Sequence, residues 1–116
     1  MTTFLCYDKC STCKKAENWL KEQGAAYTAR PIKEQNPTAA ELEGWLAQSG
    51  LPVKRFVNTS GLLYKSMGLK DKLPAMSDRQ VCELLATDGM LVKRPVLITD
   101  KGVCPGFKPE EWAKLL

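Results

Sequence analysis

Two cysteines separated by two residues, Cys10 and Cys13, constrain the fold more than any other feature of this sequence. They follow a short apolar segment, residues 3–7, which has the length and composition of a strand. From residue 11 to about residue 23 the apolar side chains recur at helical spacing, and a glycine follows as a natural stop. The pattern predicts a strand that turns into a helix, with Cys10 at the helix entrance and Cys13 one turn along its apolar side.

The remaining sequence predicts a second strand, a helical middle and a hairpin. Two capping-box sequences, which begin at Thr38 and Ser77, precede apolar runs and indicate helices. The elements predicted after the first helix are a strand at 26–30 ended by Pro31, helices after residues 38 and 77, a shorter helix at 62–67, hairpin strands at 96–99 and 103–104, and a helix from 109. This order predicts an α/β, thioredoxin-like fold (βαβ, helical insertion at about 37–90, ββα) with a mixed four-stranded sheet, in one domain over residues 1–116.

The composition is that of an ordinary folded domain. Hydrophobic residues make up 44% and charged residues 26% of the 116 residues, which argues against disorder and against a disulfide scaffold. The formal net charge of +4 comes from lysines dispersed among acids, so direct nucleic-acid binding is not expected. The sequence contains no secretion signal and no run of membrane-spanning length. We therefore expect a cytoplasmic protein without membrane contact, and we expect a monomer.

Histidine is absent, which excludes Cys-His nucleophile pairs, Ser-His-Asp triads and every zinc site that contains histidine. Cysteine attacks as a thiolate, so the chemistry of Cys10 depends on what lowers its pKa. At the first turn of a helix its sulfur can face the unpaired N–H groups of Ser11, Thr12 and Cys13. Nearby lysines, including Lys14, add positive charge. We therefore expect the thiolate of Cys10 to be favoured.

Cys13 is placed to act as a resolving thiol. In the cycle that the spacing suggests, Cys10 attacks a disulfide or another oxidised centre, and Cys13 then attacks the mixed intermediate to leave a Cys10–Cys13 disulfide. The alternatives are half of a zinc site or coincidence. Zinc would need further ligands, and the three other cysteines, Cys6, Cys82 and Cys104, form no second Cys-x-x-Cys. We therefore expect redox use without a metal, and core packing for the other three.

Arg94 and Pro95 directly precede the apolar strand at 96–99. An X-Pro bond is the only common place for a cis peptide. With a cis bond, this backbone could lie beside the thiol loop and leave Arg94 to bind an oxyanion or to pair with the thiolate of Cys10. Alternatively, the proline only starts the strand and the arginine beside it is solvated. The sequence pattern leaves both alternatives open.

Four motifs, in order along the chain, resemble the arsenate reductase (ArsC)-like family, which includes the Spx-type transcriptional regulators. They are Lys-Cys-Ser-Thr-Cys-Lys-Lys-Ala at 9–16, Asn-Thr-Ser-Gly at 58–61, Gly-Leu-Lys-Asp-Lys-Leu at 68–73 and Arg-Pro-Val-Leu-Ile at 94–98. The resemblance covers essentially the whole chain, including the helical middle. It implies a thioredoxin-like fold, Cys10 as the nucleophile and a cis peptide bond at Pro95.

The resemblance also marks where this chain departs from the family. Glutaredoxin-coupled arsenate reductases of the family use one cysteine with a preceding histidine and three arginines that hold the oxyanion. Only Arg94 falls on one of those arginines, while Asn58 and Lys108 stand at the positions of the other two. One guanidinium and one ammonium cannot reproduce three planar, bidentate donors, so the resemblance does not imply tight arsenate binding. Cys13 instead favours an intramolecular disulfide.

Two functions follow from the resemblance. The first is an arsenate-reductase-like thiol-disulfide oxidoreductase without a bound cofactor, which takes electrons from glutathione and glutaredoxin or from thioredoxin and could accept an oxyanion substrate. The second is a redox-sensing regulator of the Spx type, which uses the same cysteine pair and binds the C-terminal domain of the RNA polymerase α-subunit. For that contact the face around Gly50, Lys54 and Arg55 is available.

Overall fold

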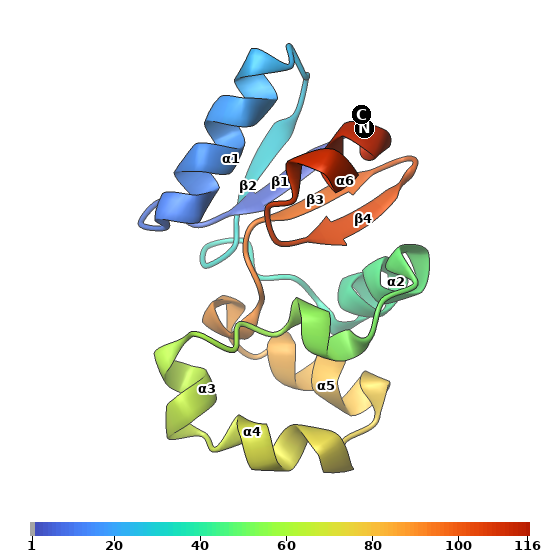
Figure 1. Cartoon of the computed structure of the whole chain (residues 1–116). Helices are drawn as coiled ribbons and strands as arrows, with labels where there is room; N and C mark the ends of the chain where they lie inside the picture. The colour runs from blue at the N-terminus through green and yellow to red at the C-terminus, as the bar shows by residue number, and fades with distance from the viewer. Residues whose placement is uncertain (1) are drawn as a thin grey trace.

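The computed structural model describes residues 2–116 and is built around one mixed sheet (Figure 1). Its strands are β1 (Thr3–Cys6), β2 (Thr28–Pro31), β3 (Val96–Thr99) and β4 (Gly102–Pro105), in the spatial order β2-β1-β3-β4. β1 runs parallel to β2 and antiparallel to β3, and β3 pairs with β4 as a hairpin. The predicted α/β, thioredoxin-like arrangement with a mixed four-stranded sheet is confirmed.

Helices cover both faces of the sheet. The six α-helices of the described residues are α1 (Ser11–Glu22), α2 (Ala39–Ser49), α3 (Leu62–Ser66), α4 (Leu69–Lys72), α5 (Asp78–Leu85) and α6 (Pro109–Leu115). In β1, Phe4 packs in a cluster with Leu20 of α1 and Trp112 of α6, whereas its neighbour Leu5 packs on the other side with residues of α2 and α5. Because successive strand side chains point to opposite faces, these two clusters are the two halves of a sandwich with the sheet in its middle.

The capping sequences act as predicted. In α2 the backbone N–H of Glu41 donates to the hydroxyl of Thr38 at 3.1 Å, and the Glu41 carboxylate accepts from the Thr38 backbone N–H at 3.0 Å. In α5 the same reciprocal pair joins Ser77 and Gln80. Each box satisfies two backbone donors that a helix start leaves unpaired, which is why both helices begin where the sequence places them.

Several short elements differ from the expectation. β2 begins two residues later than predicted and includes Pro31; as β2 is an edge strand, a residue without an N–H is tolerated there. The sequence did not predict α4 or the 3-10 turns at Val53–Phe56, Leu73–Ala75 and Gly89–Leu91. Gly68, expected only to end a helix, has φ of 63° and also starts α4. Elements of three or four residues are too short to show a period.

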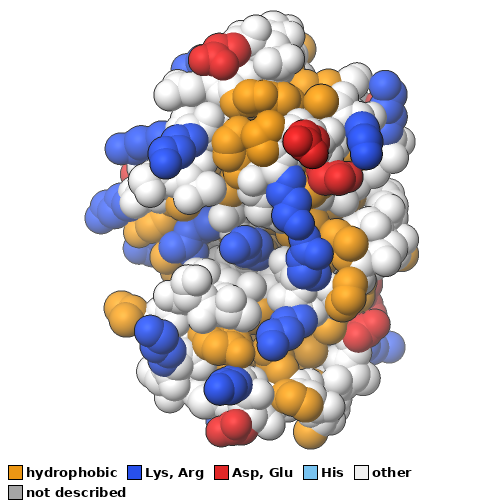
Figure 2. Space-filling model, in the orientation of Figure 1, with side chains coloured by type: hydrophobic (Ala, Val, Ile, Leu, Met, Phe, Trp, Pro, Cys, Tyr) orange, Lys and Arg blue, Asp and Glu red, His pale blue; other side chains and the backbone are white. Residues whose placement is uncertain are grey.

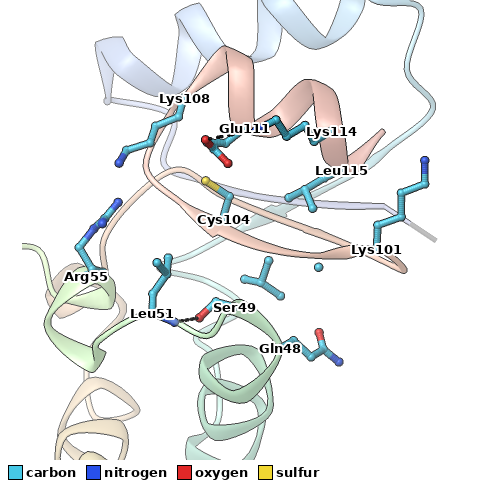
Figure 3. Close-up of a pocket in the computed structure, with 12 residues that line it drawn as sticks. Gln48, Ser49, Leu51, Arg55, Lys101, Cys104, Lys108, Glu111, Lys114 and Leu115 are labelled. Atoms are coloured by element: carbon cyan, nitrogen blue, oxygen red, sulfur yellow. Dashed lines mark hydrogen bonds and ion pairs between the residues drawn. The ribbon is translucent and has the colours of Figure 1, made fainter.

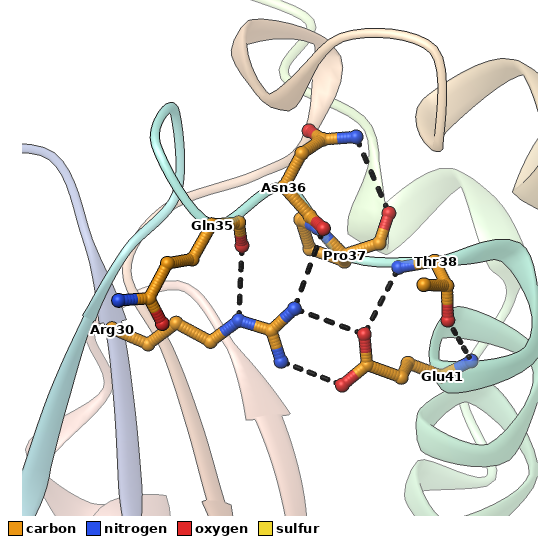
Figure 4. Close-up of polar contacts among 6 residues, drawn as sticks. All are labelled: Arg30, Gln35, Asn36, Pro37, Thr38 and Glu41. Atoms are coloured by element: carbon orange, nitrogen blue, oxygen red, sulfur yellow. Dashed lines mark hydrogen bonds and ion pairs between the residues drawn. The ribbon is translucent and has the colours of Figure 1, made fainter.

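An ion pair joins the edge of the sheet to the helical middle (Figure 4). Arg30 of β2 makes two hydrogen bonds to the carboxylate of Glu41 in α2, at 2.6 and 2.9 Å, and its Nε donates to the carbonyl of Gln35 at 3.0 Å. The hydrogen bonds from Arg30 hold the pKa of Glu41 at about 2, despite its partial burial. Thus the carboxylate that caps α2 also fixes the loop between β2 and α2.

Candidate active site

Cys10 lies at the N-cap of α1, with extended backbone angles, as the sequence predicted. Its Sγ accepts a hydrogen bond from the backbone N–H of Cys13 at 3.4 Å. Partial burial alone would raise the pKa of the Cys10 thiol, but hydrogen bonding from Cys13 and the positive charge of Arg94 outweigh that effect and lower the pKa. The thiolate of Cys10 is therefore stabilised by a helix N-terminus and by one guanidinium.

Cys13 has the opposite character. It is 3% exposed and packs with Ala16 and Leu20 on the apolar side of α1. Its Sγ accepts from the backbone N–H of Tyr7 at 3.4 Å, but burial dominates and raises its pKa to about 12. Cys13 is therefore protonated at neutral pH, whereas the surroundings of Cys10 favour its thiolate. An attacking and a resolving cysteine require a contrast in this direction.

Arg94 lies beside the cysteine pair on the loop before β3. The Arg94–Pro95 peptide bond is cis, as expected. The guanidinium carbon of Arg94 lies 4.9 Å from the centre of the Tyr7 ring, a cation–π distance. Its Nε and Nη1 are buried and have no hydrogen-bond partner among residues 2–116. A planar cation with two unused donors next to a reactive sulfur is suited to hold an anion there.

A cavity of about 350 Å³ adjoins this loop and is strongly basic. It brings together Thr12 and Arg94, both predicted as site residues, with Lys108 at the N-cap of α6. Arg55 and Lys93 line it too. The sequence analysis did not place these two at the reactive site, although Lys93 directly precedes Arg94. The cavity thus presents two guanidinium and two ammonium groups, a richer basic set than the sequence comparison suggested.

The other predicted site residues lie elsewhere. Asn58 is not among the lining residues of that cavity, because its side-chain amide donates to the carbonyl of Met90 at 3.2 Å and joins two loops. Ser11 and Lys14 are exposed on the first turn of α1. Lys14 lines a separate cavity, of about 480 Å³, together with Cys13.

The remaining cysteines are free thiols of two kinds. Cys82 and Cys104 are buried, as expected for core packing. Cys6 is only half-buried and lines the same cavity as Cys13, so the expectation of core packing holds only in part for it. Burial, followed by the negative charges of Glu17 and Asp8, raises the pKa of Cys6, which keeps it protonated.

Two further searches cover the described part of the chain. Among residues 2–116, no group of three or more cysteine, aspartate or glutamate side chains is arranged to hold a metal ion. None of the helices in the same range combines the length and apolar character that crossing a membrane requires.

A strand that enters a helix at a cysteine pair, beside a cis-proline loop, defines a thiol protein of the thioredoxin-like class. The chain belongs to the ArsC family, whose model matches residues 5–115. Its fold superposes on an ArsC family related protein from Bacteroides fragilis with a TM-score of 0.96 at 54% identity, over 99% of this chain and 97% of that one. A possible arsenate reductase from Streptococcus mutans gives a TM-score of 0.87 at 44% identity, over 93% and 92%.

Curated relatives include proteins described as regulators. Protein YusI of Bacillus subtilis, described as uncharacterized, is 46% identical over 95% of this chain and 93% of its own length. Regulatory protein MgsR of the same organism is 29% identical over 97% of this chain and 88% of its own length. The global transcriptional regulator Spx of Staphylococcus epidermidis is 25% identical over the whole chain and 87% of its own length. The proteins similar to this chain therefore include one named as a possible reductase and others named as regulators.

Proposed function

We propose that this protein is a thiol-disulfide oxidoreductase in which Cys10 is the nucleophile, Cys13 resolves and Arg94 holds an anionic group at the reacting sulfur. The observation that carries the proposal is the contrast between the two thiols. The backbone N–H of Cys13 donates to the Sγ of Cys10 at 3.4 Å, yet the pKa of Cys10 is lowered and the pKa of Cys13 is raised. A structural cysteine pair in a core has no need of such a difference.

The reaction proceeds in two exchanges. The thiolate of Cys10 attacks one sulfur of a substrate disulfide, a new S–S bond forms, and the other substrate sulfur leaves as a thiolate. Cys13 then loses its proton and attacks the sulfur of Cys10, which forms the Cys10–Cys13 bond and releases the second substrate thiolate. The substrate has gained two electrons, and an external thiol, such as glutathione with glutaredoxin or thioredoxin, reduces the internal disulfide again.

The basic cavity favours substrates that carry negative charge at the reacting atom. Arg94 has two donors free, and Arg55, Lys93 and Lys108 add positive charge from the other walls. An oxyanion such as arsenate would meet these groups as it reached Cys10, and the attack would then form a sulfur–arsenic bond with loss of water. Ser11 and Thr12 contribute backbone N–H groups at the start of α1.

The test is NADPH consumption with arsenate, and separately with a small disulfide, coupled first to glutathione and glutaredoxin and then to thioredoxin and its reductase. The proposal expects turnover with at least one substrate and its loss in Cys10→Ser. In Cys13→Ser the mixed disulfide on Cys10 should accumulate and be visible as a mass adduct. Turnover that survives in Cys10→Ser would contradict the proposal.

A second function is favoured by the relatives MgsR and Spx, which are named as regulators. In this alternative the cysteine pair is a redox switch and the protein binds the C-terminal domain of the RNA polymerase α-subunit. The expected result is capture of that domain by one redox state, without any turnover. Charge reversal at Lys54, which does not line the cavity beside Arg94, should weaken capture and leave the alkylation rate of Cys10 unchanged.

A further inference from the structure

A third, larger cavity, of about 520 Å³, lies between α6 with the β3–β4 hairpin and the C-terminal end of α2 (Figure 3). Four cations line it: Arg55, Lys101, Lys108 and Lys114. The one carboxylate among its lining residues belongs to Glu111, which is 3.9 Å from the Nζ of Lys114. An exposed pair at that separation compensates little of the charge, so the cavity is positive overall.

This cavity adjoins the one that contains Thr12 and Arg94. Arg55 and Lys108 line both, and Figure 3 shows them facing each other at one end while Lys101 lies at the other. Lys and Arg side chains also gather across the middle of this face of the molecule, between the sheet and the helical middle (Figure 2). The two cavities therefore adjoin at Arg55 and Lys108, and together we call them the basic groove: from Thr12 and Arg94, past Arg55 and Lys108, to Lys101 and Lys114.

The floor of the basic groove is apolar. Leu51, Val103 and Leu115 lie between the charged side chains. A free inorganic anion gains nothing from such a floor and would remain at the guanidinium groups. A polypeptide in extended form, by contrast, places alternate side chains toward a surface and away from it, so it can use an apolar floor and charged rims together. Lys101 also makes a polar contact within the chain: its Nζ donates to the main-chain oxygen of Leu116 at 3.2 Å.

We propose that the basic groove binds an extended acidic segment of a protein that carries the disulfide or thiol reacting with Cys10. The segment would lie beside the reacting cysteine in the partner's sequence, with its carboxylates against Arg55, Lys101, Lys108 and Lys114. This deepens the proposed function by naming its substrate class, a protein disulfide with acidic flanks, and it rests on that function for the chemistry. Charge complementarity of this kind speeds encounter and selects partners.

The first experiment measures binding alone, so that its outcome does not depend on redox activity. A fluorescent, cysteine-free peptide with alternating glutamate and leucine is titrated with the protein by anisotropy at low salt, beside a peptide in which lysine replaces glutamate. We expect only the acidic peptide to bind. Lys101→Glu with Lys114→Glu should weaken that binding by about tenfold, since each reversal exchanges an attraction for a repulsion that salt screens. Equal binding of both peptides would overturn the proposal.

Matched control variants are Lys33→Glu and Lys65→Glu, which make the same change of charge at exposed lysines outside the groove. They should bind the acidic peptide as the parent does. If they weaken binding as much as the groove variants, net charge rather than the groove is responsible and the proposal is wrong. In the last arm, an oligonucleotide of the same charge replaces the acidic peptide. If the oligonucleotide binds with the same affinity as the peptide and loses that affinity in the same groove variants, the groove binds polyanions in general and the polypeptide assignment is wrong.

The second experiment links the groove to catalysis. Two peptide disulfides with the same core, one flanked by glutamates and one by lysines, are reduced by parent and by the Lys101→Glu, Lys114→Glu double variant. We expect the variant to raise KM for the acidic substrate about tenfold, while turnover of a small disulfide stays unchanged, because neither lysine lines the cavity that contains Thr12 and Arg94. Loss of small-disulfide turnover in Cys10→Ser tests the proposed function, whereas peptide binding tests the groove.

Discussion

The two sides of the cysteine pair carry opposite charge. In the cavity that contains Arg94, whose positive charge acts on Cys10, the lining cations are Arg55, Lys93, Arg94 and Lys108. On the side of Cys13, the cavity of about 480 Å³ is lined by three acids, Asp8, Glu17 and Glu34, and by one cation, Lys14. The two cavities share no lining residue. A basic cavity and an acidic cavity therefore lie near the same cysteine pair, and we expect the charge of an approaching molecule to influence which sulfur it meets.

The largest expected effect is the difference in reactivity between the two sulfurs. At pH 7 we expect Cys13 in Cys10→Ser to react with iodoacetamide at least ~100-fold more slowly than Cys10 in Cys13→Ser, because alkylation follows the thiolate fraction. Burial, the largest cause of the raised pKa of Cys13, remains in Cys10→Ser, so the rate at Cys13 should keep rising with pH beyond the range of an ordinary thiol. Peptide mapping after timed alkylation provides the measurement. Similar rates at pH 7 would show that the contrast does not exist in solution.

Removing the guanidinium of Arg94 should reduce the positive potential at Cys10 and so raise the pKa of its thiol. In Arg94→Gln, the pKa of Cys10 loses one of the influences that lower it, so alkylation at pH 7 should slow by about tenfold and the pH profile should move to higher pH. Arg94→Lys should recover part of the rate, since it keeps the charge but not the fork of donors. Arg79→Gln, which alters an exposed arginine paired with Glu83, is the control and should leave the profile unchanged.

Reagents of different charge test the electrostatic potentials of the basic and the acidic cavity directly. Iodoacetate is anionic and iodoacetamide is neutral, and the ratio of their rates reports the local potential at a sulfur. We expect this ratio to be about threefold or more higher at Cys10 than at Cys6, which lies on the acidic side, and the difference should shrink as salt screens both surfaces. Equal rate ratios at Cys10 and Cys6 at low salt would show that the two sides do not differ in electrostatic potential.

The smallest expected effect concerns the acidic side. The hydroxyl of Tyr27 donates to the carboxylate of Glu17 at 2.9 Å, and burial together with this carboxylate raises the pKa of Tyr27 to about 12. A raised pKa means that this contribution to stability is complete below pH 10 and is lost as pH rises toward 12. Glu17→Gln should therefore let Tyr27 ionise at lower pH, as followed by phenolate absorbance.

Two reference variants accompany the Tyr27 titration. Tyr27→Phe assigns the signal, because it removes the phenol that is being followed. Glu22→Gln, at an exposed position of the same helix, should leave the titration where the parent has it. A parent titration curve that Glu17→Gln does not move would mean that the acidic side exerts no measurable field on its neighbours.

How much the sequence predicted depends on the distance between the interacting residues. The position of Cys10 at the start of α1 and the two capping boxes were predicted, because each follows from residues within one helical turn. The cis bond at Pro95 was expected from the resemblance. By contrast, Arg55 and Lys93 reach the site from different loops, and no local pattern indicates that Arg55 lies opposite Lys108. Likewise, no local pattern indicates that the side chain of Asn58 donates a hydrogen bond to Met90, 32 residues away.

The bond between Arg30 and Glu41 bears on which substitutions this chain can accept. The carboxylate of Glu41 accepts a hydrogen bond from the backbone N–H of Thr38, which caps α2, and it also accepts two hydrogen bonds from the guanidinium of Arg30 in β2. Glutamine could replace it in the cap but offers no charge to the arginine, and aspartate is one methylene shorter than the glutamate that now spans both contacts. In a library of random variants, position 41 should thus tolerate fewer residues than its half-exposed location suggests, and changes at position 30 should be accepted mainly together with changes at 41.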